Sequence, residues 1–349
     1  MKIFRLGLVP PAFSQAVYHA LAREGIESLV ILSPASSYVC VGYFQNPHNC
    51  VDLEFCQSEG IPVIRREVGG GVVLLDSNQV FYQLILRRGN PLLPGTVAEM
   101  YERFSGPPVA TYNALGVPAR HRPVNDIVTL DGRKVSGQGG ADIGPSQVFV
   151  GNIILDFDYD TMVRALRVPD EKFRDKVYKT MKDNLTTLKR ELGEAPPRRK
   201  VEDVLIGEFE KMLGPLHEES LSPEFLQKVR AMEEYLASRE FLFREGARPR
   251  GVTIREGVRL GRADYKAPGG LITAEVEAGD GTIRWLSLSG DFTFHPKDEF
   301  DGLAAAVSGL PPEKEAVKKA VGAYYSSRSI DSPGVTPEDI ATVVVKALG

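Results

Sequence analysis

Residues 65–76 read RREVGGGVVLLD and carry the strongest indication of fold and site in this chain. A predicted strand ends near two arginines, three glycines follow, and a new strand begins at Val72. Glycine has no Cβ, so the backbone can turn sharply and come close to a ligand. Successive N–H groups in such a turn can converge on an anion, and arginine adds fixed charge suited to phosphate. The alternative is a hairpin bulge with solvated arginines, because glycine-rich turns are common.

A second stretch, residues 125–137, reads NDIVTLDGRKVSG. Asp131-Gly132 supplies the positive φ that a tight turn needs and predicts a hairpin, with Lys134 just past the turn. Taken alone, Asn-Asp is most often a turn former, and a hairpin lysine is most often solvated. The small polar run SGQGG that begins at Ser136 strengthens the case that Asn125-Asp126 and Lys134 are functional, because a ligand could lie against it.

The elements around these motifs alternate between strands and helices, which predicts an α/β or α+β fold. A helix is expected to begin at Ser14, and a single helix is expected over 97–115. Strands are expected over 2–9, 61–68, 72–75, 80–86 and 148–157, a helical region over 161–239, strands again over 251–254, 258–265, 270–276 and 283–288, and three helices at the end. We expect two domains, residues 1–245 and 246–349.

Composition narrows the class of protein. The chain has 349 residues and a formal net charge of −4, so a nucleic-acid-wrapping or membrane-docking surface is not expected. It holds 3 cysteines, a low and odd number that favours reduced thiols and a cytoplasmic location. Its first residues do not have the pattern of a secretory signal peptide. The five histidines form no metal-ligand motif with a cysteine.

Together the two stretches resemble the arginine–glycine motif and the lysine signature of lipoate–protein ligases, within the biotin/lipoate ligase family. Three further segments fit: VGYFQ at 41–45 looks like the Gly-x-x-Gln strand end, 150–156 looks like the strand after the lysine signature, and GDFTF at 290–294 resembles the accessory C-terminal domain. The resemblance implies a class II synthetase/biotin-ligase-like catalytic domain, with mixed β-sheets and flanking helices, plus a smaller α/β C-terminal domain.

The resemblance also implies an activity. Lipoate and ATP would give lipoyl-AMP and pyrophosphate, and the acyl group would pass to a lysine of an apo lipoyl carrier, such as a 2-oxoacid dehydrogenase E2 domain or a glycine cleavage H protein. Lys134 would be the catalytic residue, Asp126 would hold Mg²⁺, and the chain would act as a monomer. The residues implied to bind ATP or lipoyl-AMP are Arg66, Gly69, Gly70, Gly71, Val72, Val73, Leu74, Asn125, Asp126, Lys134, Ser136, Gly137 and Gly151.

Three departures from the family pattern leave substrate preference open. Val68, Leu75 and Val150 are aliphatic where the family often has serine, histidine and histidine. An octanoyl- or lipoyl-transferase of the same fold is an alternative, although such enzymes use a cysteine after the lysine signature and no cysteine follows Cys56 here. A non-catalytic binder of lipoate or of a lipoyl domain is the other alternative, and biotin ligase is a weaker one.

Overall fold

The computed structural model describes residues 1–168, 170–244 and 258–349. The chain divides into two compact units. The N-terminal unit comprises residues 1–41, 47–67 and 72–242, and the C-terminal unit comprises residues 42–46, 68–71 and 243–349. The boundary expected between 245 and 246, and the strand expected over 251–254, lie outside the described residues.

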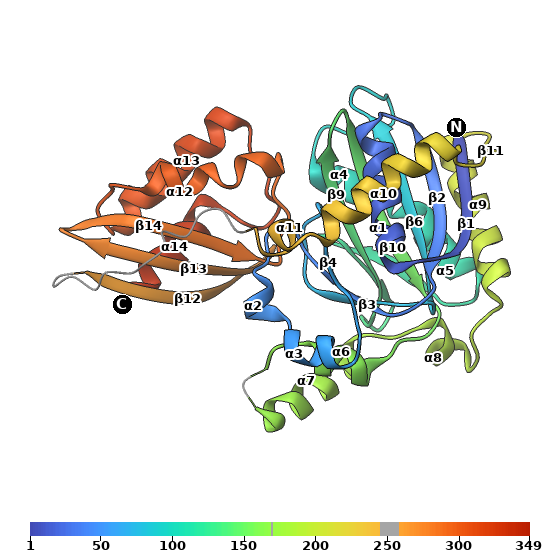
Figure 1. The fold of residues 1–349 in the computed structure, drawn as a ribbon, viewed down its shortest axis with the longest axis horizontal. Helices are drawn as coiled ribbons and strands as arrows, with labels where there is room; N and C mark the ends of the chain where they lie inside the picture. The colour runs from blue at the N-terminus through green and yellow to red at the C-terminus, as the bar shows by residue number, and fades with distance from the viewer. Residues whose placement is uncertain (169, 245–257) are drawn as a thin grey trace. The chain divides into compact units, whose positions relative to one another are not determined.

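The N-terminal unit is built around one mixed sheet of eight strands, in the order β11-β1-β2-β6-β10-β9-β8-β7 (Figure 1). Its strands are β1 (Lys2–Val9), β2 (Ser28–Pro34), β6 (Gln79–Arg87), β7 (Ala119–Arg122), β8 (Asp126–Thr129), β9 (Lys134–Ile143), β10 (Ser146–Ile154) and β11 (His217–Glu218). β1 pairs in parallel with β2 and β11, and the remaining pairs are antiparallel. The expected α/β (α+β) class is therefore confirmed.

Helices cover both faces of this sheet. The helices of the unit are α1 (Pro11–Arg23), α2 (Pro47–Cys50), α3 (Leu53–Ser58), α4 (Val97–Phe104), α5 (Gly106–Ala114), α6 (Tyr159–Ala165), α7 (Glu171–Asn184), α8 (Leu188–Leu192), α9 (Arg198–Leu213) and α10 (Pro223–Ala237), and α11 (Arg239–Phe243) follows. α1 contacts β2, β6 and β10, and α10 packs on α1.

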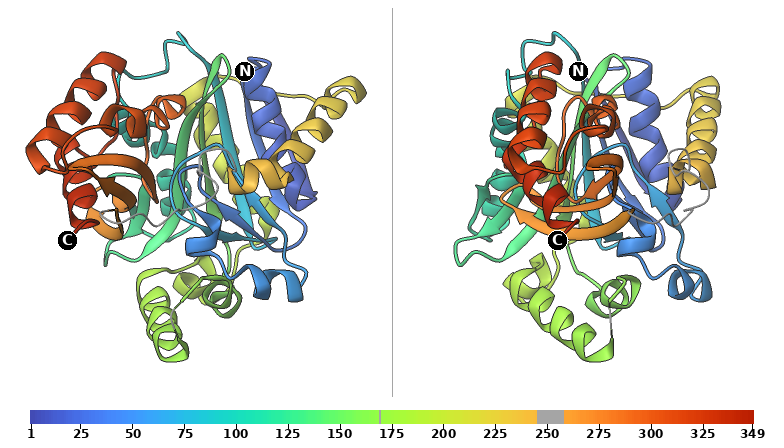
Figure 2. Two further views of the ribbon diagram at one scale, coloured as in Figure 1. Left: turned by 60° about the vertical axis from the view of Figure 1, so that its left-hand side comes forward. Right: turned by 90° about the vertical axis from the view of Figure 1, so that its left-hand side faces the viewer.

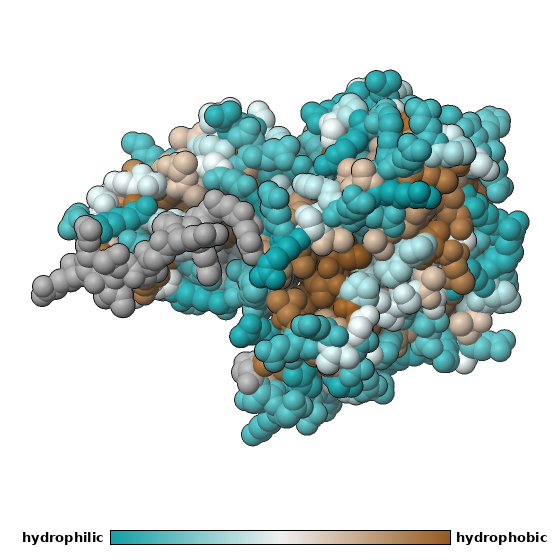
Figure 3. Space-filling view, viewed as in Figure 1, coloured by the Kyte–Doolittle hydropathy of each residue, from teal (hydrophilic) through white to brown (hydrophobic). Residues whose placement is uncertain are grey.

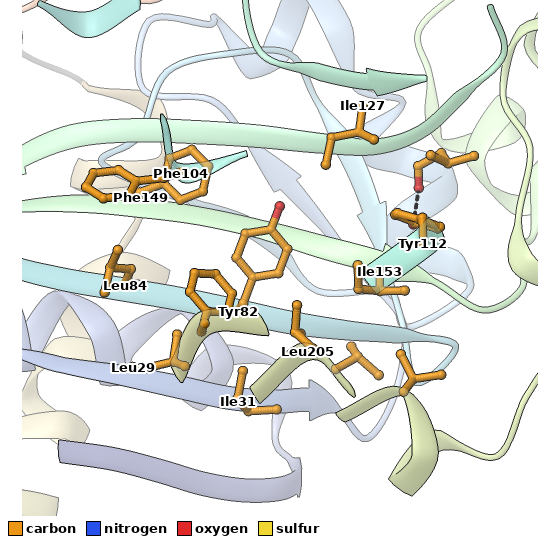
Figure 4. Close-up of a cluster of buried hydrophobic side chains, with 14 of the residues drawn as sticks. Leu29, Ile31, Tyr82, Leu84, Phe104, Tyr112, Ile127, Phe149, Ile153 and Leu205 are labelled. Atoms are coloured by element: carbon orange, nitrogen blue, oxygen red, sulfur yellow. Dashed lines mark hydrogen bonds between the residues drawn. The ribbon is translucent and has the colours of Figure 1, made fainter. Parts of the chain in front are cut away.

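The opposite face carries the main core, which α4, α5 and α9 close (Figure 4). Alternate residues of each strand point to this face, such as Leu29 and Ile31 of β2, because side chains of a strand alternate between its two faces. Tyr82 lies at the centre, with its ring centroid 5.5 Å from that of Phe209 on α9. Tyr112 of α5 donates its hydroxyl to Val135 O at 2.6 Å, which links this core to β9.

A second, three-stranded sheet stands beside the large one, in the order β4-β3-β5. Its strands are β3 (Tyr38–Val41), β4 (Val63–Arg65) and β5 (Val73–Leu75). β3 pairs in parallel with β4 and antiparallel with β5. The segments after β3 and between β4 and β5 therefore leave the same end of this sheet.

The C-terminal unit is a three-stranded meander with helices on it (Figure 2). Its elements are β12 (Arg259–Ala267), β13 (Gly270–Gly279), β14 (Thr282–Gly290), α12 (Gly302–Val307), α13 (Lys314–Arg328) and α14 (Pro337–Lys346), with a short 3₁₀ turn at Lys297–Glu299. Ile272, Val276 and Val317 belong to its buried core. Thr336 caps α14 through a capping box with Asp339, as expected for a helix opened by Thr-Pro.

Three expectations for individual elements were wrong. The helix expected over 97–115 is two helices, because the chain bends at Ser105 and α5 begins with prolines in its first turn, where proline is tolerated. Ser14 is not a helix cap: α1 begins at Pro11, and the Ser14 hydroxyl donates to Pro11 O inside the helix. The strand expected over 61–68 has only three residues, Val63–Arg65.

Among the described residues, no helix combines the length and the apolar composition that crossing a bilayer requires.

Phe209 provides a test of the packing of the main core. Its side chain is fully buried, so Phe209→Ala should lower the free energy of unfolding by about 3–5 kcal/mol through lost burial and a cavity. Chemical denaturation followed by far-UV circular dichroism measures this. Leu130→Ala is the control, since that side chain is 69% exposed and its loss should change the free energy by less than about 0.5 kcal/mol. Equal effects of the two substitutions would contradict this account of the core.

Candidate active site

The β8–β9 hairpin places Lys134 at the start of its second strand. Gly132 has φ +90° in the connecting turn, a conformation that glycine adopts without strain, as expected for Asp-Gly. Asp126 lies opposite Gly137 in the pairing of the two strands, and Ile127 lies opposite Ser136. The expected hairpin is confirmed, and five of the sequence-predicted site residues lie within it or beside it: Asn125, Asp126, Lys134, Ser136 and Gly137.

A carboxylate holds the Lys134 ammonium group. Lys134 Nζ lies 2.6 Å from Asp126 Oδ1, and Arg122 Nη2 donates to Asp126 Oδ2 at 2.8 Å. The Lys134 side chain is 38% exposed, so its amine is accessible while it is held in place. One carboxylate thus organises two cations at one surface of the sheet.

These two cations determine the protonation of Asp126. Burial would raise the pKa of this carboxyl, but the attraction of Lys134, its hydrogen bond and that of Arg122 outweigh the effect, so the pKa lies below its usual value. Asp126 is therefore an anion throughout the neutral range.

Gly137 lies beside the amine, and polar side chains near it tie the neighbouring strands together. A Cβ on residue 137 would lie 3.3 Å from Lys134 Nζ, so glycine at this position leaves space beside the amine. Ser136 Oγ donates to Asn152 O at 2.6 Å. Asn125 Nδ2 donates to Gln138 O at 2.8 Å, which ties the start of β8 to β9.

Gly151 of β10 has a packing role in this region. A Cβ at residue 151 would lie 2.2 Å from the hydroxyl oxygen of Tyr82, which is the residue paired with it on β6. Tyr82 OH in turn accepts a hydrogen bond from Gln138 Nε2 at 3.0 Å. The glycine is required so that the buried tyrosine can reach this polar network.

The two arginines of the first motif are buried. Arg65 is 1% exposed and donates from Nε and Nη2 to Leu242 O, at 2.9 and 2.7 Å. Arg66 is 9% exposed, and its Nη1 donates to Cys40 O at 3.2 Å. Neither side chain is a solvated arginine at a hairpin bulge, so that alternative reading of the motif is wrong.

The three glycines belong to the C-terminal unit. Gly70 has φ +88°, and its N–H donates to Phe292 O at 3.1 Å, so this amide already has an acceptor. A Cβ on Gly69 would lie 2.5 Å from the same carbonyl oxygen. Val72 is half-buried, while Val73 and Leu74 lie in β5 of the small sheet.

The sequence analysis did not single out two residues, one that binds Asp126 and one that packs in the core of the C-terminal unit. Arg122 is the second cation on Asp126, and its signal was its place in a short strand just before Asn125-Asp126. Phe44 is 4% exposed in the core of the C-terminal unit, where its ring centroid lies 4.7 Å from that of Phe300 and 5.4 Å from that of Phe292. The aromatic run of 292–294 offered a partial signal for such a cluster.

Asp126, the residue implied to hold Mg²⁺, is engaged by two cationic side chains. Both oxygens of Asp126 already accept from cationic side chains. Within the described ranges, no group of three or more histidine, cysteine, aspartate or glutamate side chains is arranged to hold a metal ion. In this structure Asp126 is the partner of Lys134 and Arg122.

Comparison with known proteins identifies the class. Residues 8–210 match the family described as the lipoyl protein ligase A/B catalytic domain, and the chain belongs to this family. Its relatives include enzymes of two kinds. The chain is 25% identical over 186 residues to lipoate-protein ligase A subunit 1 of Thermoplasma acidophilum, covering 51% of this chain and 69% of that protein. It is 27% identical over 220 residues to octanoyltransferase LipM of Kyrpidia tusciae, covering 56% of this chain and 80% of the relative.

Solved structures show the same fold. A bi-partite lipoate protein ligase described with its E2 lipoyl domain, from T. acidophilum, has a TM-score of 0.63 at 22% identity over 72% of this chain and 98% of its own. A lipoate-protein ligase A described as bound with ATP has a TM-score of 0.59 at 19% identity, over 69% of this chain and 98% of its own. P. falciparum LipL1 in complex with lipoate has a TM-score of 0.66 at 16% identity, over 94% of this chain and 98% of its own. The expected biotin/lipoate ligase-like fold is confirmed.

Gly69 and Gly71 provide a matched pair for testing the glycine turn. Gly69→Ala should lower the stability of the C-terminal unit by about 1–3 kcal/mol, because its Cβ would lie 2.5 Å from Phe292 O. Gly71→Ala should be nearly neutral, since its Cβ would lie 3.6 Å from the Asp291 side chain. The single tryptophan, Trp285 in β14, reports unfolding of this unit by fluorescence. If both variants unfold like the wild type, the turn is not packed as described.

The ion pair of Asp126 predicts a pH dependence. Because its folded pKa lies below the usual 3.8, the stability that it contributes is complete above that pH and is lost as the pH falls through the folded pKa. Asp126→Asn should therefore be less stable than the wild type at pH 7, by about 1 kcal/mol for a partly exposed pair. This difference should shrink below pH 3.8. Denaturation at several pH values measures it, with the exposed Asp175→Asn as the control; a difference that stays constant down to pH 2 would contradict the assignment.

Proposed function

We propose that this protein is an ATP-dependent lipoate–protein ligase that acts in the cytoplasm. It would activate lipoate as lipoyl-AMP and then acylate a lysine of an apo lipoyl carrier, with Mg²⁺ arriving on the phosphates of ATP as part of that substrate. Membership of the family supports lipoate chemistry but includes both ligases and octanoyltransferases. The choice between them depends on the residues of this chain.

The observation that carries the proposal is the arrangement around Lys134. An ammonium group has three N–H donors, and Asp126 takes one of them at 2.6 Å. Two donors remain for a carboxylate oxygen and an α-phosphate oxygen, the two groups that must meet when an acyl-adenylate forms. Because Gly137 leaves space beside Nζ, both oxygens can approach the amine.

The chemistry follows from this placement. A carboxylate oxygen of lipoate attacks the α-phosphorus of ATP, a P–O bond forms, and the bond to pyrophosphate breaks. Negative charge accumulates between two anions in this step, and a fixed cation lowers its energy most when it is already oriented. Asp126 orients the ammonium group, and Arg122 adds a second positive charge beside the same carboxylate.

The second step needs no nucleophile from the enzyme. The neutral ε-amine of the carrier lysine attacks the acyl carbon, an amide C–N bond forms, and AMP leaves with the electron pair of the broken C–O bond. The proton lost by the amine passes to the departing phosphate or to water. Carriers that fit this step are an E2 lipoyl domain, like the one described with the T. acidophilum ligase, or a glycine cleavage H protein. We propose that the chain does this as a monomer.

The thiols of this chain argue against the transferase alternative. Burial raises the pKa of the Cys40 thiol, with a partial opposing effect from Arg66. Burial and the nearby Asp52 raise the pKa of the Cys56 thiol to about 11. A thiol with a raised pKa is a weak nucleophile at neutral pH because it holds little thiolate. Cys50, in α2, is half-buried and is the most exposed of the three cysteines, since the other two are buried.

The remaining expectations are part of the proposal. Arg66 and the segment Gly69–Leu74 would contribute to nucleotide binding, with Arg66 acting from its buried position. This requires Gly70 N–H to exchange its bond with Phe292 O for a phosphate oxygen. Val68, Leu75 and Val150 are aliphatic, so their side chains form no hydrogen bonds. They would favour an apolar acyl chain, lipoyl or octanoyl.

Lys134→Ala tests the assignment. Lipoate-dependent exchange of pyrophosphate into ATP, measured without a carrier, should fall by at least about a hundredfold, because the oriented cation is lost. Far-UV circular dichroism should stay unchanged, since this side chain is 38% exposed. The exposed Lys200→Ala, on α9, is the control and should retain exchange.

Two outcomes would overturn the proposal. Near-normal exchange by Lys134→Ala would remove the lysine from the reaction. Acyl transfer that needs no ATP and is lost in Cys50→Ala would identify a transferase instead.

A further inference from the structure

Helix α1 buries a stripe of polar side chains. Gln15, His19 and Arg23 follow one another at four-residue intervals, which places them on one face of the helix. Gln15 is 5% exposed and His19 is fully buried, whereas the Arg23 side chain is 36% exposed. The buried face of a helix is normally apolar, and polar groups are costly to bury unless they have partners. The partners of this stripe therefore indicate its role.

Two residues of the stripe hold Glu67, which directly follows Arg66 in the arginine–glycine motif. Arg23 Nη2 donates to Glu67 Oε1 at 2.5 Å, and this glutamate side chain is 3% exposed. One turn earlier on α1, His19 Nε2 accepts from the backbone N–H of Glu67 at 3.1 Å. One residue is thus held twice, at its backbone and at its side chain, by a single turn of helix. We call these two bonds the Glu67 clamp.

The hydrogen bonds of His19 determine which of its nitrogens carries hydrogen. Its Nδ1 lies 2.7 Å from Gln15 O, and a carbonyl oxygen only accepts, so Nδ1 is the donor. Its Nε2 accepts from Glu67 N–H and carries no hydrogen. These two bonds assign the neutral Nδ1–H form of the ring. Gln15 Nε2 in turn donates to Tyr38 OH at 2.7 Å, which ties the same face of α1 to β3.

A second helix keeps Arg23 in this position. α10 packs on α1, and the Arg23 guanidinium lies over the ring of Tyr235, 5.8 Å from its centroid. A cation over an aromatic face is attracted to the ring, which restricts its orientation. Hydrophilic and apolar residues both appear on the side of the unit where α10 lies (Figure 3). The Glu67 side chain is not part of this surface, because it is buried.

The clamp fixes the segment that carries Arg66. Arg66 N–H donates to Val41 O at 3.0 Å, and Arg66 Nη1 donates to Cys40 O at 3.2 Å, so β3 holds the start of this segment. The clamp holds the next residue, Glu67. An arginine whose backbone is fixed on both sides loses little conformational freedom when an anion binds, and it therefore binds the anion more tightly.

We propose that His19 and Arg23 are positioning residues for Arg66: by holding Glu67 they keep the arginine where it meets the phosphates of the nucleotide. This inference rests on the proposed function for the anion that Arg66 binds, and on the contacts of α1 for the placement of the arginine. Both residues act through Arg66, so their effect on nucleotide binding depends on its presence.

Removing the cation of the clamp tests this role. Arg23→Ala should raise the KM for ATP in lipoate-dependent pyrophosphate exchange about tenfold and change kcat by less than about twofold, because Arg66 binds a phosphate both before and during the reaction. Arg23→Lys keeps a cation beside Glu67 and should stay within about threefold of the wild type. Arg199→Ala is the matched control and should behave as the wild type, since it removes an exposed arginine of α9 that also pairs with an aspartate.

A double-substitution cycle separates positioning from a general loss of structure. Its second substitution is Arg66→Met, which removes the charge and keeps most of the length of the side chain. In the Arg66→Met background, Arg23→Ala should change the KM for ATP by less than about twofold, because the group through which it acts is missing. A residue that only stabilises the fold would raise the KM by the same factor in both backgrounds. Far-UV circular dichroism and thermal unfolding check that each variant is folded.

Hydrogen exchange tests the clamp without any reaction. The amide of Glu67, followed by mass spectrometry on the full chain, should exchange at least about tenfold faster in Arg23→Ala and in His19→Leu than in the wild type. His19→Gln keeps a side-chain acceptor for this amide and should exchange more slowly than His19→Leu. The control Arg199→Ala should leave the rate unchanged.

The positioning proposal is wrong if Arg23→Ala raises the KM no more than the control does, or by the same factor in both backgrounds of the cycle. It is also wrong if the exchange of the Glu67 amide is unchanged in Arg23→Ala. Failure of the proposed function gives a different result, which is a wild-type chain without lipoate-dependent pyrophosphate exchange. Hydrogen exchange still tests the hold of α1 on Glu67 in that case.

Discussion

The ion pair between Asp126 and Lys134 is the interaction on which the proposed chemistry depends. It forms because two adjacent antiparallel strands place Asp126 opposite Gly137, three residues from Lys134, while a short edge strand supplies Arg122. A lone lysine on a hairpin is a mobile charge, and its ordering costs entropy when substrate binds. The carboxylate removes part of that cost before substrate arrives.

The arginine–glycine motif at 65–76 has a different organisation. Its arginines are buried in the N-terminal unit, but its three glycines pack with residues of the C-terminal unit, and Gly70 N–H donates to Phe292 O. Phe44, which follows β3, lies in the aromatic core of that same unit. The glycine segment, which the family resemblance implies for ATP, is therefore packed within the C-terminal unit.

Much of the fold could be predicted from local patterns. The Asp131-Gly132 turn, the strands β1 and β3 and the capped α14 follow from short-range rules of turn, pairing and capping. The family motifs also brought Lys134, Asp126 and Asn125 together in the prediction. The break at Ser105 was missed because the apolar periodicity of 97–115 continues across it. The sequence alone thus determined the family and the fold class, and it led us to expect Lys134 as the amine of the site. Only the tertiary structure decided that Arg122 completes the ion pair, that the glycines pack against Phe292 and that Thr186 N–H donates to Lys134 O. These contacts join residues that are distant in the sequence, and no local periodicity records them.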